Sequence, residues 1–281
     1  MKEVDIVFHR ADHDGKLSAW IAAEWVRRSG DLPVFVGLDY GDDIPSFAQR
    51  HVIMLDFSLP DMGAVLKSAK SLVWVDHHVT SMDKVEKSGV FIQGMRRVGE
   101  AACVLSWRYF IGTPPPKGVM LLGAYDVASG DIHSLYYENY FQCFNTDPAV
   151  FNWGMAISMA DANINQVLEI GSLIQKRDEN RFKTDIRSGI EVVVAGHPCL
   201  TLNSQQVGSK VFGDRLSKYS ACLIWHFVGK DRIRWRAYSH GDGGMNVAAL
   251  ASGFGGGGHR HAAGFYTDSE TGEKILSGMC Q

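Results

Sequence analysis

The sequence predicts an α/β protein with two domains: an N-terminal, doubly wound parallel sheet and a smaller C-terminal α/β domain, with a cleft between them. In the first half of the 281 residues, continuous apolar runs alternate with helical patterns. The rigid stretch Pro114–Pro116 and a charged, helix-like segment separate this half from a strand-rich and glycine-rich end. We therefore expect domains at 1–163 and 190–281, joined by a connecting helix or linker over 164–189.

Hydrophobic periodicity predicts the elements of the first domain. Apolar runs typical of strands buried on both faces of a parallel sheet occupy 4–8, 34–36, 52–55 and 72–75. Leu17, Ile21 and Trp25 recur at the spacing of one helix face, which predicts a helix between the first two strands. A second helical pattern runs from Gly99 to Phe110 and stops before the prolines.

The second domain has a different pattern. After a helix-like segment at 164–183, strands are predicted at 191–195, 200–203, 221–228 and 232–238. A tight turn joins the last two strands, and a short helix at 245–252 precedes the segment GFGGGGHRHAAGF.

Composition and charge narrow the function classes. Hydrophobic residues make up 46% and charged residues 21%, which is ordinary for a soluble globular protein. A net charge of −3 excludes a generally basic protein that coats nucleic acid, but it allows a local phosphate site. The five cysteines form no Cys-x-x-Cys pair, and no apolar run resembles a signal peptide or a membrane span. We expect a cytoplasmic protein.

Acidic and histidine residues follow the predicted strands. They are His9, Asp12 and Asp14 in FHRADHDG, Asp56 in VIMLDFS, Asp76, His77 and His78 in LVWVDHHVT, and Asp126 after the apolar LLGAY. Because ligands of open α/β sheets bind beyond the carboxyl ends of the strands, these residues are expected at one edge, with Asp126 counted as a fourth strand-end position. A single such Asp is more often a helix cap, but the whole set is poorly explained by coincidence. His13 and His51 are expected on the surface or in loops.

The residue types at this edge indicate a metal site. Carboxylates and imidazoles without thiolates suit Mn²⁺, Mg²⁺, Fe²⁺ or Zn²⁺, and the oxygen-rich balance favours Mn²⁺. Crowded carboxylates repel one another unless cations lie between them. Two divalent ions that share one carboxylate are the simplest solution, and this arrangement serves in-line attack on phosphate esters.

Two further features concern anion binding. The glycines of GGGGHRHAAGF let the backbone approach an anionic ligand, although neither a P-loop nor a Gly-x-Gly-x-x-Gly motif is present. A flexible linker is the alternative, and an ordered turn is favoured. Arg232, Arg234 and Arg236 alternate with apolar residues and form one strand face, which is either solvated or in contact with phosphate. Arg96 and Arg97 are candidates to reach the metal edge.

Taken together, FHRADHDG, LDFS, VDHH, AYD and GGGGHRHAAGF resemble the motifs of the DHH/DHHA1 phosphoesterase superfamily, in the same order and over nearly the whole chain. The resemblance implies a DHH catalytic domain and a DHHA1 substrate-binding domain. Size and layout are similar to those of nanoRNase-type members, which degrade short oligoribonucleotides and linear dinucleotides. The chain departs from the family pattern in having two residues, not three, between His9 and Asp12, and in reading RAYS at 236–239 where Ser-Leu-Arg-Ser is usual.

The resemblance also implies roles for single residues. One Mn²⁺ would be held by His9, Asp12 and Asp56, and a second by Asp14, Asp56, His77 and Asp126, with Asp56 bridging. Asp76 would orient His77, and His78 would face the scissile phosphate. Substrate-binding residues would be Gly256, Gly257, Gly258 and His259, together with Arg97.

The expected function is that of a Mn²⁺-dependent phosphodiesterase, with Mg²⁺ or another divalent ion as the alternative metal. It would cut short linear RNA, including dinucleotides such as pGpG of cyclic di-GMP signalling, to nucleoside monophosphates. Alternatives are a 3′-phosphatase on pAp, a cyclic (di)nucleotide phosphodiesterase, a polyphosphatase, or a non-catalytic nucleotide-binding sensor. No membrane and no long duplex is expected as a partner, and a homodimer is compatible with the resemblance because some relatives pair.

Overall fold

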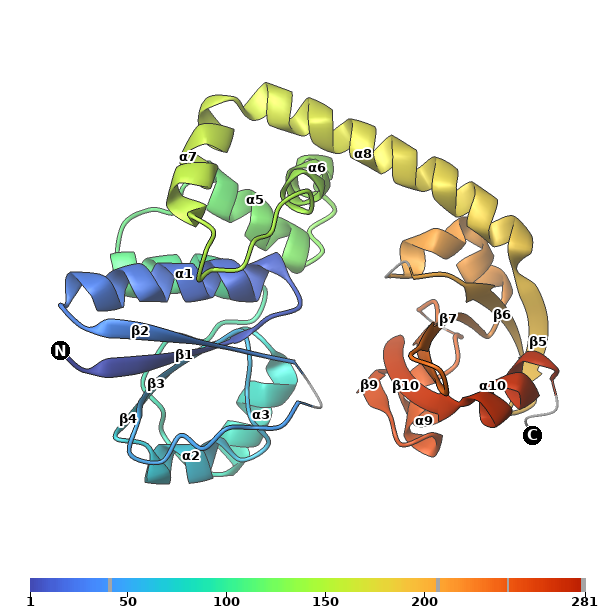
Figure 1. The fold of residues 1–281 in the computed structure, drawn as a ribbon, viewed down its shortest axis with the longest axis horizontal. Coiled ribbons are helices and arrows are strands. Elements are labelled where there is room, and N and C mark those ends of the chain that lie inside the picture. Colours follow the sequence, from blue (N-terminus) through green and yellow to red (C-terminus); the bar gives the residue numbers. More distant parts are fainter. Residues whose placement is uncertain (40–41, 206–207, 242, 279–281) are drawn as a thin grey trace. The chain divides into compact units, whose positions relative to one another are not determined.

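The computed structural model describes residues 1–39, 42–205, 208–241 and 243–278. They form two compact units, Met1–Gln175 (unit 1) and Lys176–Gln281 (unit 2), and the long helix α8 (Ile164–Asp185) begins in the first and ends in the second (Figure 1). No helix in the described part of the chain is both long and apolar enough to cross a lipid bilayer.

Unit 1 contains a sheet and a set of helices. Its strands are β1 (Glu3–His9), β2 (Leu32–Leu38), β3 (His51–Leu55) and β4 (Ser71–Val75). Its helices are α1 (His13–Arg28), α2 (Met62–Ser68), α3 (Val79–Lys87), α4 (Ala102–Ser106), the π-helical turn η1 (Trp107–Ile111), α5 (Lys117–Asp126), α6 (Ile132–Phe141), α7 (Trp153–Ala162) and the start of α8. All four predicted strands of this unit are present.

The unit 1 sheet is parallel and doubly wound, as predicted. Its strand order is β2-β1-β3-β4, so the chain leaves β1 to one side through α1 and later returns to the other side. Helix α1 covers one face, and α2 and α3 lie on the opposite face (Figure 1). Such a reversal of strand order opens a ligand-binding crevice beyond the carboxyl ends of the strands.

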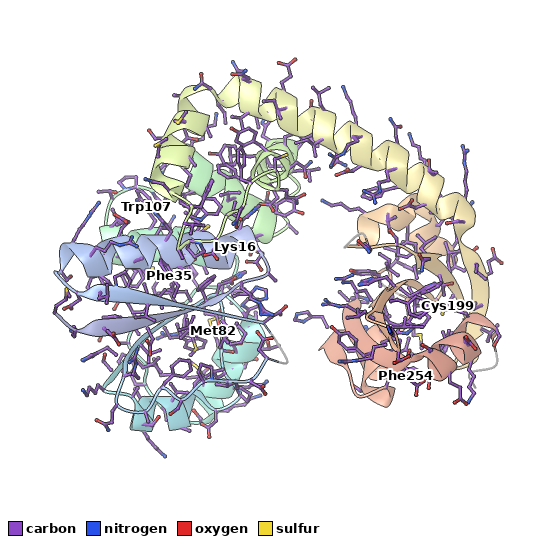
Figure 2. All side chains as sticks on the ribbon, viewed as in Figure 1. Lys16, Phe35, Met82, Trp107, Cys199 and Phe254 are labelled. Carbon is purple, nitrogen blue, oxygen red and sulfur yellow. The ribbon has the colours of Figure 1, made fainter. Side chains whose placement is uncertain are left out.

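Apolar side chains fill the layers on both faces of this sheet. The layer beneath α1 contains Ile6 and Phe8 from β1, whereas Val7 of the same strand packs in the layer with α2. This alternation follows from the pleat of a strand, which points successive side chains to opposite faces. Figure 2 shows the two layers, with Phe35 labelled in one and Met82 in the other.

The segment before Asp126 corrects one expectation. Residues 117–126 form helix α5, so Asp126 ends a helix and not a strand. The physical reason is that this segment is buried among other helices and starts directly after Pro116, a residue suited to the start of a helix. A short apolar run in such a place has no periodicity that separates a buried helix from a buried strand.

Unit 2 contains a six-stranded mixed sheet in the described residues, with the order β5-β6-β7-β8-β10-β9. Its elements are the end of α8, η2 (Ile186–Ser188), β5 (Ile190–Val194), β6 (His197–Asn203), the 3₁₀ segment η3 (Ser209–Lys218), β7 (Ala221–Val228), β8 (Arg232–Tyr238), α9 (Val247–Gly253), β9 (Gly257–His259), β10 (Ala262–Asp268) and α10 (Ser269–Leu276). The predicted strands and the short helix are present. The glycine-rich segment is an ordered edge strand, β9, and not a flexible linker.

Candidate metal centre

The register of the parallel sheet brings the strand-end residues to one level. Phe8 pairs with Leu55, and Leu55 pairs with Val75. The residues that come next are His9 on β1, Asp56 after β3 and Asp76 after β4, and these three lie side by side along the sheet edge. This is the edge at which the sequence predicts a site.

Three groups of His and Asp side chains meet here. Among the described residues, the sets whose ligand atoms all lie within 4.8 Å of one another are His9, Asp12 and Asp56; Asp14, His77 and Asp126; and Asp56, His77 and His78. The first two sets together contain all six residues to which the resemblance gives a metal role, and Asp56 and His77 each belong to two sets. The three groups therefore overlap through Asp56 and His77 and form one continuous cluster of candidate metal ligands.

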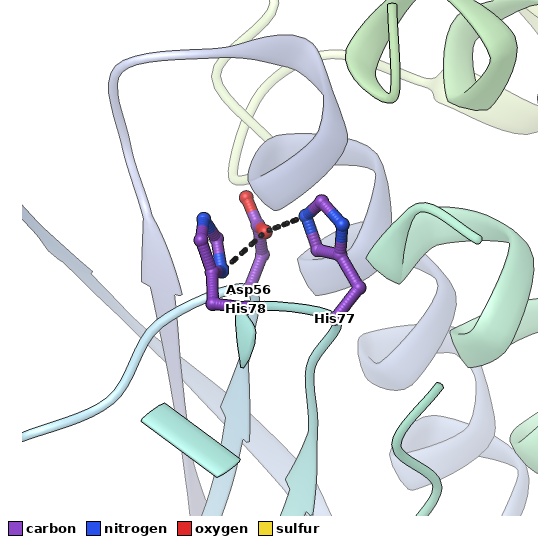
Figure 3. Close-up of side chains that lie close together, drawn as sticks. All are labelled: Asp56, His77 and His78. Atoms are coloured by element: carbon purple, nitrogen blue, oxygen red, sulfur yellow. Dashed lines mark ion pairs between the residues drawn. The ribbon is translucent and has the colours of Figure 1, made fainter. Parts of the chain in front are cut away.

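Asp56 lies at the centre of the site. It directly follows β3, is 2% exposed and has a left-handed backbone with φ of 52°. Figure 3 shows its carboxylate between two imidazoles: Oδ1 is 3.2 Å from His77 Nε2 and 3.8 Å from His78 Nδ1. Burial, followed by the charges of Asp14 and Asp12, raises the pKa of Asp56 well above its ordinary value.

Burial disfavours the charged forms of Asp126 and His77 as well. Burial and neighbouring carboxylates, Asp14 foremost, raise the pKa of Asp126 to about 9. Burial lowers the pKa of His77, which favours the neutral imidazole that binds metals. Asp126 Oδ2 lies 3.2 Å from His77 Nε2, so a carboxylate and a neutral ring nitrogen already converge.

The chemistry of these side chains fits divalent cations. Asp56 Oδ1 and Asp126 Oδ2 are buried and lack a hydrogen-bond partner within the part of the chain that the structure describes. A buried carboxylate oxygen without a partner is costly, and the cost falls when a cation coordinates it. Oxygen donors with two or three imidazoles match Mn²⁺ or Mg²⁺ better than a thiol-binding metal.

Asp12 and Asp14 have a capping role as well as a place in the site. Asp12 is the N-cap of α1: its Oδ1 accepts from Gly15 N at 2.9 Å, while its Oδ2 lies 2.5 Å from His9 Nδ1. Asp14 is 3% exposed and accepts from the first N–H groups of α4, at Ala102 (2.8 Å) and Cys103 (2.6 Å). Each carboxylate keeps lone pairs for a cation, so the capping and metal roles are compatible.

Asp76 orients His78, whereas the resemblance implied that it orients His77. Asp76 is fully buried, and its Oδ1 lies 2.7 Å from His78 Nδ1. It contacts His77 only through the main chain, accepting from its N–H at 2.7 Å. The main chain turns directly after β4, which brings the ring of residue 78, not that of 77, back to the carboxylate. The hydrogen bond to Asp76 raises the pKa of His78.

Sequence reasoning missed one carboxylate at this edge. Asp39 follows β2, and its Oδ1 lies 3.5 Å from His9 Nε2. Asp42 accepts from Arg10 Nη1 at 2.5 Å and from Asp39 N at 2.8 Å, and so links Asp39 to the residue that follows β1. The strand-end rule, applied to the predicted strand at 34–36, would have found Asp39.

The candidate substrate residues lie in different settings. Arg97 has a 62% exposed side chain that donates to Glu100 at 2.9 Å, and its N–H donates to Asp76 O, so it is next to the metal edge. Arg96 is held by the carbonyl groups of Trp74 and Ile92 and stacks on the Trp74 ring. Arg96 is therefore explained by packing, whereas the Arg97 side chain is exposed and ion-paired with Glu100.

In unit 2, two of the three predicted substrate-binding glycines pack closely against β10, and the third is open. A Cβ at Gly256 would meet Gly264 O at 2.2 Å, and one at Gly258 would meet Ala262 O at 2.6 Å, so close approach to β10 requires both glycines. Gly257 faces open space. It pairs with Gly264, which pairs with Arg236, so the three occupy one row of the same sheet face.

Comparisons with known proteins give matches among solved structures. No family model matches the chain, and no curated protein matches it. The pGpG-specific phosphodiesterase PggH of Vibrio cholerae is 13% identical, with 99% of this chain and 97% of that chain covered at a TM-score of 0.47. An exopolyphosphatase-related protein from Bacteroides fragilis is 15% identical (98% and 90% covered, TM-score 0.48), and a manganese-bound exonuclease RecJ is 12% identical (98% and 89%, TM-score 0.49). Each of these three alignments covers nearly the whole of this chain.

Proposed function

We propose that this chain is a Mn²⁺-dependent phosphodiesterase that hydrolyses short linear oligoribonucleotides, including dinucleotides such as pGpG, to nucleoside monophosphates. The observation that carries the proposal is the convergence of His9, Asp12, Asp14, Asp56, His77 and Asp126 at one sheet edge, with the buried Asp56 shared between groups. The motifs in which these residues occur support the substrate class.

Each group has a proposed role. His9, Asp12 and Asp56 are the proposed ligands of one ion, and Asp14, Asp56, His77 and Asp126 those of the second. Two bound ions would supply an activated water and neutralise charge on the phosphate. His78, held by Asp76 and favoured in its charged form, is the proposed donor to a phosphate oxygen. Arg97 is the proposed contact on the phosphate's exposed side.

Unit 2 is proposed to bind the nucleotide end of the substrate through residues 256–259 and the face of β8. Arg236 Nη1 is buried and has no hydrogen-bond partner among the described residues. The bare row of Gly264 and Gly257 lies beside it, which leaves room for a base or a sugar on the same face. A nucleotide phosphate would satisfy this guanidinium.

A substrate panel tests the proposed function. Purified, metal-free protein is supplied with Mn²⁺ and incubated with pGpG, pApA, a longer RNA, pAp, a cyclic dinucleotide and polyphosphate, and the products are separated by chromatography. We expect nucleoside monophosphates from the dinucleotides, at a higher rate than any product from the other substrates. Faster turnover of pAp, the cyclic dinucleotide or polyphosphate would replace the proposed substrate class. No product at all would indicate a nucleotide-binding sensor.

The Asp76–His78 pair provides a first mutational prediction. Asp76→Asn removes the negative charge that holds His78, and its amide N–H₂ would face the N–H donors that now bond to the Asp76 carboxylate. We therefore expect kcat on pGpG to fall about 10- to 100-fold. The pKa of His78 falls without the carboxylate, so the alkaline limb of the kcat–pH profile should move to lower pH. An unchanged profile would exclude His78 as the charged donor. Asp61→Asn, at the N-cap of α2, is the control.

Arg236 provides a second prediction. Arg236→Gln removes a charged donor from the proposed nucleotide surface, so KM for pGpG should rise about tenfold or more while kcat changes little. Arg232→Gln is the matched control, because Arg232 lies on the same strand face but stacks on the Tyr266 ring at the exposed end of the strand. Equal effects of the two substitutions would indicate general electrostatic attraction and not a site at Arg236.

A further inference from the structure

A buried histidine–glutamate contact lies next to the candidate metal centre, because His13 stands between Asp12 and Asp14. His13 Nδ1 is 2.8 Å from Glu138 Oε1, and both residues are 7% exposed. The imidazole packs edge-on against the rings of Phe141 and Trp153. The expectation that His13 lies on the surface or in a loop is therefore wrong, because helix α6 covers it with a carboxylate and α7 with an aromatic ring.

The position of His13 in the chain gives this pair its significance. It stands between Asp12 and Asp14, so any rotation of its main chain moves both of these carboxylates. Asp12 is held by the first turn of α1 and Asp14 by the first turn of α4. The pair with Glu138 adds a third attachment, to α6. Three separate elements thus hold three consecutive residues.

Stability alone is a poor explanation for this pair. Burying a polar pair away from water is costly, and apolar residues of similar volume often serve folding equally well. The surroundings of His13 are aromatic and would accept such residues. Divalent ions, in contrast, require their ligands within about 0.5 Å of the correct position. The pair is better suited to fixing position than to adding stability.

We propose that His13 and Glu138 are positioning residues that set the placement of Asp12 and Asp14 and thereby the affinity of the site for divalent cations. This inference rests on the proposed function, because it takes Asp12 and Asp14 as metal ligands. Neither His13 nor Glu138 touches the metal or the substrate in this scheme. Their effect is transmitted through the main chain of residues 12–14.

The test measures Mn²⁺ binding to metal-free protein by calorimetry, together with thermal unfolding. Glu138→Gln should weaken Mn²⁺ binding about 10- to 100-fold. The double variant His13→Phe/Glu138→Leu replaces the pair by apolar groups, and we expect its metal-free Tm to equal or exceed that of the parent while its Mn²⁺ affinity falls by the same factor. A stable protein with a weakened site is an outcome that a merely structural pair would not produce.

Tyr137→Phe is the matched control for this test. Tyr137 neighbours Glu138 on α6, is fully buried and donates to Asp161, so its loss should lower Tm without changing Mn²⁺ affinity. If the variants at His13 and Glu138 bind Mn²⁺ as tightly as the parent, the positioning role is overturned while the proposed function stands. If the parent protein itself binds no Mn²⁺, the proposed function fails first, and the positioning role fails with it.

Discussion

Asp56→Asn should abolish turnover and at the same time stabilise the metal-free protein. As the proposed shared ligand of both ions, Asp56 affects the whole site, so we expect kcat on pGpG to fall at least about 1,000-fold. Without cations, its buried charge is repelled by Asp14 and Asp12. Removing this charge should therefore raise the free energy of unfolding by about 1 to 2 kcal/mol at pH 8. Asparagine also tolerates the left-handed backbone at this position better than alanine does.

The matched control is Asp5→Asn, on the same sheet but in an ordinary ion pair. Asp5 is 4% exposed and accepts from Arg50 Nε at 2.8 Å and Arg50 Nη2 at 2.5 Å. Its loss removes the charged acceptor of two hydrogen bonds and leaves Arg50 paired with Glu3 alone among the described residues, so stability should fall by about 1 to 3 kcal/mol while kcat stays within about twofold. The two variants should thus change stability in opposite directions, and only Asp56→Asn should lower kcat. An Asp56→Asn protein that is active when loaded with Mn²⁺ would remove Asp56 from the site.

Mn²⁺ should stabilise unit 1 strongly, and more so at higher pH. The pKa values of Asp56 and Asp126 are raised in the folded, metal-free chain, so that chain holds more protons than the unfolded one between the ordinary carboxyl pKa and the raised values. Stability in EDTA must then decrease as pH rises through this range. The raised pKa values of His9 and His78 act in the same direction above pH 6.5. The lowered pKa of His77 has the opposite effect on stability, but only below pH 6.5, where the unfolded chain protonates this ring more readily than the folded one.

Thermal unfolding in EDTA and in Mn²⁺ checks this prediction between pH 6.5 and 8.5. At 100 times Kd, a bound ion contributes about 2.7 kcal/mol, which corresponds to a rise in Tm of roughly 5 to 10 °C for a domain of this size. We expect Tm in EDTA to fall with pH and the shift caused by Mn²⁺ to grow, because cations replace protons at the carboxylates. A Mn²⁺ shift that is absent, or that shrinks as pH rises, would contradict a carboxylate metal centre. Asp56→Asn should flatten the pH dependence in EDTA.

Much of unit 1 could be predicted because local pattern and sheet register agree there. Apolar runs at 6–8, 52–55 and 72–75 are continuous, and each is followed at once by a polar residue. Because β1, β3 and β4 are neighbours in a parallel sheet, the first residue after each apolar run lies at the same height along the sheet edge. The joint placement of His9, Asp56 and the Asp-His-His segment therefore needs no knowledge of side-chain packing.

Other features depended on contacts between distant segments. The helix before Asp126 arises because residues 117–126 are enclosed by other helices, and an apolar run of this length carries no periodicity of its own. Glu138 lies in a helix without a motif, and only the packing of α6 over α1 brings it to His13. Asp76 contacts the ring of His78 and not that of the adjacent His77 because the main chain turns after β4, which residue order alone does not reveal.

The sequence by itself determined the α/β class, the strands of unit 1, four of the six described strands of unit 2 and the residue types that meet at the sheet edge. These follow from periodicity along the chain and from the fixed geometry of parallel strands. The tertiary structure alone decided which atoms are left without partners, which pKa values are raised and which side chains hold the carboxylates in place. Those properties depend on burial and on distances of a few ångströms between residues far apart in the chain, such as His13 and Glu138, and no local pattern encodes them.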